Sequence, residues 1–144
     1  MPKSPSQIAL SRKSHTTPER TAARAAVRAG DDSQQTAVEA AKAALEKKAE
    51  GVVVLDLRDV SGYADFLVIG SGTSDRHLES VAEGVEKTLK DAGHRVIGSE
   101  GHRGGRWVLL DFGDVVVHVF HHEERAHYDL EGLWADVPRV EVPA

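Results

Sequence analysis

The sequence predicts an α/β fold in which a sheet of five strands has helices packed against it. Three observations support this prediction. Apolar, β-branched runs of strand length recur along the chain, two longer segments carry apolar residues at helical spacing, and turn-forming Gly and Asp residues separate them. Strands mixed with two substantial helices are typical of a sheet covered by helices, and no internal repeat is visible.

The first helix is expected to begin at Ser33 or Thr36 and to end at Gly51. Its sequence, AVEAAKAALEKKAEG, consists mainly of strong helix formers, and Gly can close the C-terminus of a helix. Small apolar residues recur at helical spacing and mark the face that should be buried. They are Val38, Ala41 and Leu45.

Two buried strands are predicted next, at residues 52–57 (VVVLDL) and 65–72 (DFLVIGSG). A second helix then starts after Ser74, which stands before an acidic first turn, and stops at Gly93. The apolar residues of this helix recur every three or four positions, at Leu78, Val81, Val85 and Leu89. They give the clearest helical pattern in the chain.

The last part of the sheet is predicted from three further segments. Residues 95–99 form a short strand, and the glycine-rich residues 100–106 form a mobile turn. Residues 106–112 (RWVLLDF) and 114–120 (DVVVHVF) flank Gly113 and are expected to pair as an antiparallel hairpin.

Length and composition indicate one soluble domain. The chain has 144 residues, of which 40% are hydrophobic, enough for a single apolar core. It has no Cys, so disulfides and thiolate metal sites are excluded, and no segment is long and apolar enough to span a bilayer. We expect a disordered basic tail at residues 1–35, a folded domain at 36–138 and a short C-terminal tail at 139–144.

Charge is distributed unevenly along the chain. Residues 1–28 contain six Lys or Arg and one Glu, a net charge of +5, which leaves −10 on the rest for a total of −5. So acidic a domain is repelled by nucleic acid and attracts a cationic protein, although an acidic surface can also serve solubility alone. The tail is either a plain flexible segment or, by its Arg and Ala content, an organellar transit peptide. We therefore expect a cytoplasmic protein, or one of an organelle matrix if the tail is a targeting segment.

One candidate for chemistry is Gly70-Ser71-Gly72-Thr73-Ser74, a glycine-rich turn between a strand and a helix. Backbone N–H groups and the helix dipole can hold a phosphate in such a turn. However, the P-loop Lys and the full dinucleotide fingerprint are missing, and residues 95–99 supply no pair of carboxylates for Mg²⁺. We expect a structural turn and no cofactor. The alternative is a nucleotide-binding or nucleotidyltransferase-type enzyme that uses Gly70 to Ser74.

A second candidate is a group of histidines that could ligate zinc together with Glu123 or Glu124. The group consists of His118, His121, His122 and His127. Their spacing matches no metal motif, and alternation places His118 beside Val116 and Phe120 on one face of an apolar strand. We expect no metal site here.

Other signals for catalysis are weak. The Gly-x-Ser-x-Gly motif of hydrolases is absent. Asp111 and Asp114 bracket the predicted hairpin turn, where Asp is a common turn former. The chain is therefore predicted not to be an enzyme.

Aromatic residues concentrate near the C-terminus, beside acidic residues. Tyr63 and Phe66 lie elsewhere, whereas Trp107, Phe112, Phe120, Tyr128 and Trp134 fall within the last 40 residues. Protein interfaces are enriched in Trp and Tyr, so this concentration suggests a binding surface with an acidic rim. Packing in the core is the competing explanation.

Taken together, YADFLVIGSGTSDRHLESVAEGVEKTLK, EG and RWVLLDFGDVVVHVFHHEERAHYDLEGLW resemble the ribosomal silencing factor family, also called Iojap-like or the DUF143 type. The match runs from about Val38 to Pro138. Its most specific part is DFGDVVVHVFH followed by R-x-x-Y-D-L-x-x-L-W-x-D-x-P.

The resemblance implies a mixed sheet related to the nucleotidyltransferase fold but without catalytic residues. It also implies binding to large-subunit ribosomal protein fourteen, on the face of the large ribosomal subunit that meets the small one. The mechanism would then be steric obstruction of subunit joining. Members of the family lower translation during starvation or stationary phase, and some act in large-subunit assembly or in organelles. The resemblance leaves open a homodimer of the free protein.

Eight residues of this chain occupy motif positions that belong to the interface in the family. The resemblance implies that they lie in or directly behind the contact surface. They are Trp107, Leu110, Asp111, His118, Phe120, Tyr128, Leu130 and Trp134. The chain departs from the family in its long basic tail and in reading LWADVP where many relatives have Gly after the Trp. The tail is a candidate for contact with ribosomal RNA through counterion release.

Overall fold

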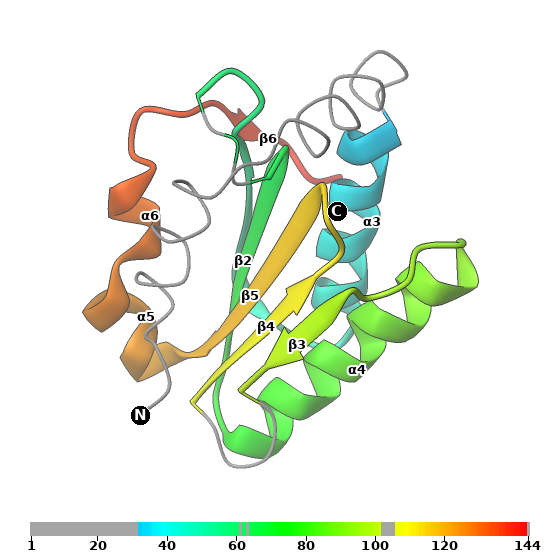
Figure 1. Cartoon of the computed structure of the whole chain (residues 1–144). Coiled ribbons are helices and arrows are strands. Elements are labelled where there is room, and N and C mark those ends of the chain that lie inside the picture. Colours follow the sequence, from blue (N-terminus) through cyan, green and yellow to red (C-terminus); the bar gives the residue numbers. More distant parts are fainter. Residues whose placement is uncertain (1–31, 61, 63, 102–105, 144) are drawn as a thin grey trace.

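Figure 1 shows the computed structural model, which describes residues 32–60, 62, 64–101 and 106–143. Residues 1–31 of the predicted tail, Tyr63 and residues 102–105 of the predicted turn lie outside these ranges. None of the helices within the described ranges has the length and apolar character needed to cross a membrane.

The described residues form a six-stranded mixed sheet in the order β3-β4-β5-β2-β1-β6. β2 pairs with β5 in parallel, and all other neighbouring strands are antiparallel. The strands are β1 (Glu50–Asp56), β2 (Phe66–Gly72), β3 (Gly98–Glu100), β4 (Trp107–Asp111), β5 (Val115–His121) and β6 (Arg139–Val140). The predicted α/β class and mixed sheet are confirmed.

Within the described ranges the sheet has one strand more than the sequence predicts. Arg139–Val140 pair with β1, in the segment that was expected to be a C-terminal tail. Two residues are too few for a recognisable strand pattern, so only their pairing defines them. β3 also begins later than the predicted 95–99, because its register follows from pairing with Leu109 to Asp111 of β4.

Helices cover both faces of the sheet (Figure 1). α3 (Asp32–Glu46) and α4 (Asp75–Asp91) lie on one face. The shorter α5 (His122–Tyr128) and α6 (Leu130–Leu133) lie on the other. The sheet is therefore sandwiched between a long and a short pair of helices.

α4 begins and packs as predicted. The Ser74 side chain accepts a hydrogen bond of 3.1 Å from the His77 N–H, and Asp75 supplies negative charge at the positive end of the helix dipole. Its buried residues are the four predicted ones and Ala82. The helix ends at Asp91, two residues before Gly93, which has a φ of 95°.

α3 differs from the prediction in its ends and in its buried face. It begins at Asp32, inside the predicted tail, and ends at Glu46. Lys48 takes the left-handed conformation (φ 68°) after the helix, so Gly51 is not the stop and belongs to β1. The buried residues are small; they are Ser33, Thr36, Ala37, Ala40, Ala41, Ala43 and Ala44. Of the predicted stripe only Ala41 is in the core, because a surface of small side chains packs closely against α4 and the sheet.

The predicted hairpin of β4 and β5 is confirmed. The two strands pair from Trp107 opposite Phe120 to Asp111 opposite Val116. At the turn, Asp111 Oδ1 accepts a hydrogen bond of 2.8 Å from the Gly113 N–H, and Gly113 has a φ of 92° that favours Gly.

Apolar side chains form two clusters, one on each side of the sheet. Phe66 and Val68 belong to the cluster beneath α3 and α4, whereas Leu67 and Ile69 belong to the cluster on the α5 and α6 side. Every residue of β2 and β5 is buried, as expected where both faces of parallel strands are covered. The cluster on the α5 and α6 side contains most of the residues predicted to bind a partner.

Candidate functional site

Four rings stack one on the next over the sheet face that α5 and α6 partly cover. Trp107 comes from β4, His118 and Phe120 from β5, and Tyr128 from the end of α5. Successive ring centroids are 6.1, 5.9 and 6.0 Å apart, with interplanar angles below 30° in each pair. Such offset stacking is favourable for aromatic rings. We call these four residues the aromatic row.

The centre of the aromatic row is buried, and its ends reach the surface. His118 and Phe120 are 0% exposed, whereas Trp107 and Tyr128 are half-buried. The Trp107 indole N–H donates to His118 Nδ1 at 3.0 Å. Because an indole nitrogen only donates, His118 Nδ1 must be unprotonated, and the imidazole is held in one orientation. Trp107 and Tyr128 are thus the members that a partner can touch.

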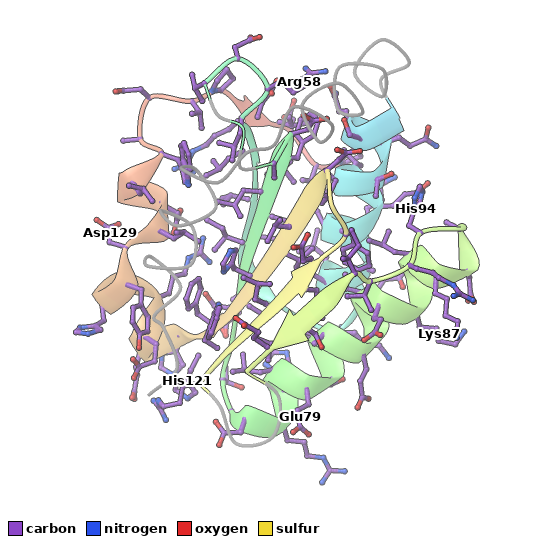
Figure 2. All side chains as sticks on the ribbon, in the orientation of Figure 1. Arg58, Glu79, Lys87, His94, His121 and Asp129 are labelled. Carbon is purple, nitrogen blue, oxygen red and sulfur yellow. The ribbon has the colours of Figure 1, made fainter. Side chains whose placement is uncertain are left out.

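α6 extends this face beyond Tyr128. Leu130 and Trp134 are 2% and 5% exposed and pack into the same cluster, with half-buried Leu133 beside them. Asp129, labelled in Figure 2 between the two helices, has a φ of 43° and accepts a 3.1 Å hydrogen bond from the Gly132 N–H. Gly132 has no room for a Cβ, because the Asp129 carboxylate lies against it. A tight turn therefore presents α6 to the sheet.

Acidic side chains lie on and between α5 and α6, the helices at the Tyr128 end of the aromatic row. Glu123 and Asp129 are exposed, and Glu124 and Glu131 are half-buried. Arg106 joins the start of β4 to α5 through Glu123 (2.8 Å) and Glu124 (3.0 Å). Arg125 and Arg139 likewise pair with Glu131, so three of these four acids have a cationic partner. The rim of the half-exposed apolar groups is therefore acidic by a small excess of charge, which favours a basic protein.

The eight residues predicted for the interface do not all lie together. Six of them belong to the aromatic row or to the Leu130 and Trp134 packing behind it. Leu110 points to the opposite side of β4 and is fully buried in the cluster beneath α3 and α4. Asp111 lies at the hairpin turn, where its carboxylate binds the Gly113 N–H. Leu133, Arg106 and Arg125 are neighbours of the row that sequence reasoning did not select.

The turn Gly70 to Ser74 uses its polar groups inside the protein. Ser71 Oγ accepts a hydrogen bond of 2.9 Å from Arg125 Nη1, and Ser74 caps α4. The Thr73 N–H donates to His77 Nδ1 at 3.0 Å, and His77 Nε2 lies 2.8 Å from the Lys47 carbonyl oxygen. Two of the backbone N–H groups that could hold a phosphate, those of Thr73 and His77, are therefore engaged by side chains, and so is the Ser71 hydroxyl group.

Adding ATP and Mg²⁺ is accordingly expected to leave the melting temperature unchanged. A nucleotide at 100 times its dissociation constant would add about 2.7 kcal/mol of stability, a readily measured rise. A thermal-shift titration with ATP, with and without Mg²⁺, checks this expectation. A saturable rise in melting temperature would instead support the nucleotide-binding alternative.

Three of the candidate metal ligands lie close to one another. Donor atoms of His121, His122 and Glu123 are within 4.8 Å of each other at the junction of β5 and α5. However, Arg106 Nη2 is 3.2 Å from His121 Nδ1 and 2.8 Å from Glu123 Oε2. A guanidinium ion thus occupies the position that a metal ion would need. The His118 ring stacks with Trp107 and Phe120, and the His127 ring meets Tyr128 edge-on.

Comparison with known proteins gives consistent matches over most of the chain. The family model described as "Ribosomal silencing factor during starvation" matches residues 30–144. Ribosomal silencing factor RsfS of Halalkalibacterium halodurans is 46% identical over 97 residues, covering 67% of this chain and 83% of that protein. A solved structure from Chromobacterium violaceum has a TM-score of 0.69 and 35% identity, covering 77% of this chain and 89% of that chain. Mouse "Mitochondrial assembly of ribosomal large subunit protein 1" is 35% identical over 92 residues, 62% of this chain and 40% of that protein.

Proposed function

We propose that the chain, which belongs to the ribosomal silencing factor family, binds the large ribosomal subunit and blocks joining of the small subunit. The direct partner is large-subunit ribosomal protein fourteen. The protein acts by occupying the face of the large subunit that meets the small subunit, and not by catalysis. Translation is thereby lowered when nutrients are limiting, which fits the description of the family as acting during starvation.

The observation that carries this proposal is the aromatic row with its acidic rim. Half-buried Trp107, Tyr128 and Leu133 offer apolar contact area above a rigid, buried base. Rigid aromatic side chains lose little conformational entropy on binding and are frequent interface hot spots. The acidic rim attracts a basic ribosomal protein and disfavours direct contact with RNA phosphates. A role in large-subunit assembly is compatible with the same contact, and the name of the mouse relative supports it.

The first test is co-sedimentation of the purified protein with separated large and small subunits. The protein is expected to sediment with the large subunit only, and isolated ribosomal protein fourteen is expected to compete for it. In a joining assay, preincubation of the large subunit with the protein should reduce formation of complete ribosomes. Absence from the large-subunit fraction would overturn the proposal. If the protein binds the large subunit but has no effect on joining, the proposed partner stands and the blocking mechanism is rejected.

A further inference from the structure

α5 supplies part of the candidate binding face and is attached to the rest of the protein through several polar side chains. None of the described α5 residues, His122–Tyr128, is fully buried, and the apolar contact of the helix with the core comes from half-buried Tyr128 at its end. It ends in Tyr128, an outer member of the aromatic row, and leads into α6. Its position therefore depends on polar contacts along the helix as well as on the stacking of Tyr128 on Phe120.

Arg125 makes the most enclosed of these contacts. Its side chain is only 17% exposed. The Nε atom lies 2.7 Å from Glu131 Oε1 on α6, and Nη1 donates to Ser71 Oγ on β2 (2.9 Å) and to the Glu50 carbonyl oxygen on β1 (3.3 Å). One guanidinium group thus joins α5, α6 and the ends of two strands. Hydrogen bonds between charged groups at this level of burial are stronger than those at an exposed surface.

The sheet is shaped to receive this side chain. Gly51 has a φ of 56°, and a Cβ at that position would lie 2.8 Å from Arg125 Nη1. Ser71 is 4% exposed, so its hydroxyl group is directed into the protein at the site where Arg125 enters. By contrast, the Arg106 contacts to α5 lie at the surface, with the Arg106 and Glu123 side chains 44% and 65% exposed. Exposed pairs of this kind contribute little to stability.

We propose that Arg125 is a positioning residue that holds the α5–α6 segment, residues 122–137, in the conformation that binds the ribosome. The turn that resembles a nucleotide-binding loop supplies, through Ser71, the point where Arg125 attaches. This inference rests on the proposed function, because the segment includes Tyr128, Leu133 and Trp134 of the candidate contact face. Arg125 itself is enclosed by these internal contacts and acts through the residues that it places.

A positioning role predicts a specific kinetic signature. Without Arg125, the segment samples other conformations, and only a fraction of the molecules is ready to bind at any moment. The apparent association rate falls with that fraction, whereas the complex, once formed, dissociates at its original rate. A residue that directly touches the partner would instead raise the dissociation rate.

The test combines hydrogen exchange with binding kinetics on Arg125→Gln, Arg125→Lys and Ser71→Ala. Lys87→Gln on α4 is the matched control, since it removes an exposed ion pair on the opposite side of the sheet from Asp129 (Figure 2). In Arg125→Gln, amide protection should fall in residues 122–137 but not in α4, and association with the large subunit should slow about tenfold with little change in dissociation. Ser71→Ala and Arg125→Lys should give intermediate effects, because each keeps part of the contact.

Three results would overturn the inference. Unchanged exchange in residues 122–137 of Arg125→Gln would show that the segment is held by other contacts. Faster exchange with unchanged association, or a change confined to dissociation, would show that the position of the segment does not control binding. The exchange measurement does not need the ribosome. If the unaltered protein does not bind the large subunit, the proposed function is wrong. The exchange measurement still decides whether Arg125 holds the segment.

Discussion

Replacing Trp134 with Ala is expected to lower the free energy of unfolding by about 3–5 kcal/mol, the usual cost of truncating a buried aromatic residue. Trp134 is only 5% exposed and packs with Leu130 and the sheet residues of the cluster beneath α6. The loss combines reduced apolar burial with the cavity left between α6 and the sheet. Chemical denaturation followed by circular dichroism measures the change.

Leu133→Ala is the matched comparison for this measurement. Leu133 precedes Trp134 in the chain but is half-buried, so its truncation should cost about 1 kcal/mol. Trp134→Phe fills part of the cavity and should fall between the two. Equal stability of Trp134→Ala and the unaltered protein would mean that α6 is not packed on the sheet in solution. Trp134 would then be exposed and available to a partner, as its position in the family motif suggests.

Much of the fold follows from local patterns in the sequence. β2 and β5 are continuous apolar runs because both of their faces are covered, and such runs are recognisable without any partner. α4 carries its own start signal at Ser74 and a regular buried stripe. The hairpin turn at Gly113 combines a residue with positive φ and a neighbouring Asp that binds its N–H.

Most of the incorrect predictions share a physical cause, which is dependence on distant parts of the chain. α4 and the sheet lie close to α3 and decide which of its faces is buried. Alanines are therefore buried there in place of the larger Val38 and Leu45. β6 exists only through pairing with β1. Leu110 is a different case: strand alternation, a local pattern, directs it to the opposite face from Trp107, whereas the family motif alone had assigned it to the contact surface.

In the candidate site, too, some features follow from local sequence patterns and others depend on distant parts of the chain. Alternation along β5 is enough to place His118 and Phe120 on one face, and the structure confirms this. The contact between Arg125 and Ser71 joins residues 54 positions apart, and neither residue type signals it. Sequence reasoning considered Ser71 as part of a phosphate-binding turn, whereas its partner in the structure is a cation from the same chain.

Tyr128→Ala is expected to weaken binding to the large subunit about 30-fold or more, as for a hot-spot residue contributing roughly 2 kcal/mol. Tyr128 is half-buried, stacks on Phe120 with centroids 6.0 Å apart, and lies within the acidic rim. Its ring therefore combines exposed apolar area with a fixed orientation, which lowers the entropy cost of binding. Quantitative co-sedimentation at constant ionic strength measures the change in affinity.

Comparison with truncations elsewhere makes this prediction specific to the aromatic row. Leu45→Ala on α3 and Ile97→Ala next to β3 remove exposed apolar side chains, 39% and 70% exposed respectively, that lie outside the row. Both variants should bind like the unaltered protein, and Tyr128→Phe, which keeps the ring, should bind closer to it than Tyr128→Ala does. If Ile97→Ala or Leu45→Ala weakens binding while Tyr128→Ala does not, the contact surface lies on another face of the molecule. The acidic rim would then be a feature of solubility alone, because charge on a face that meets no partner serves only to keep the protein dispersed.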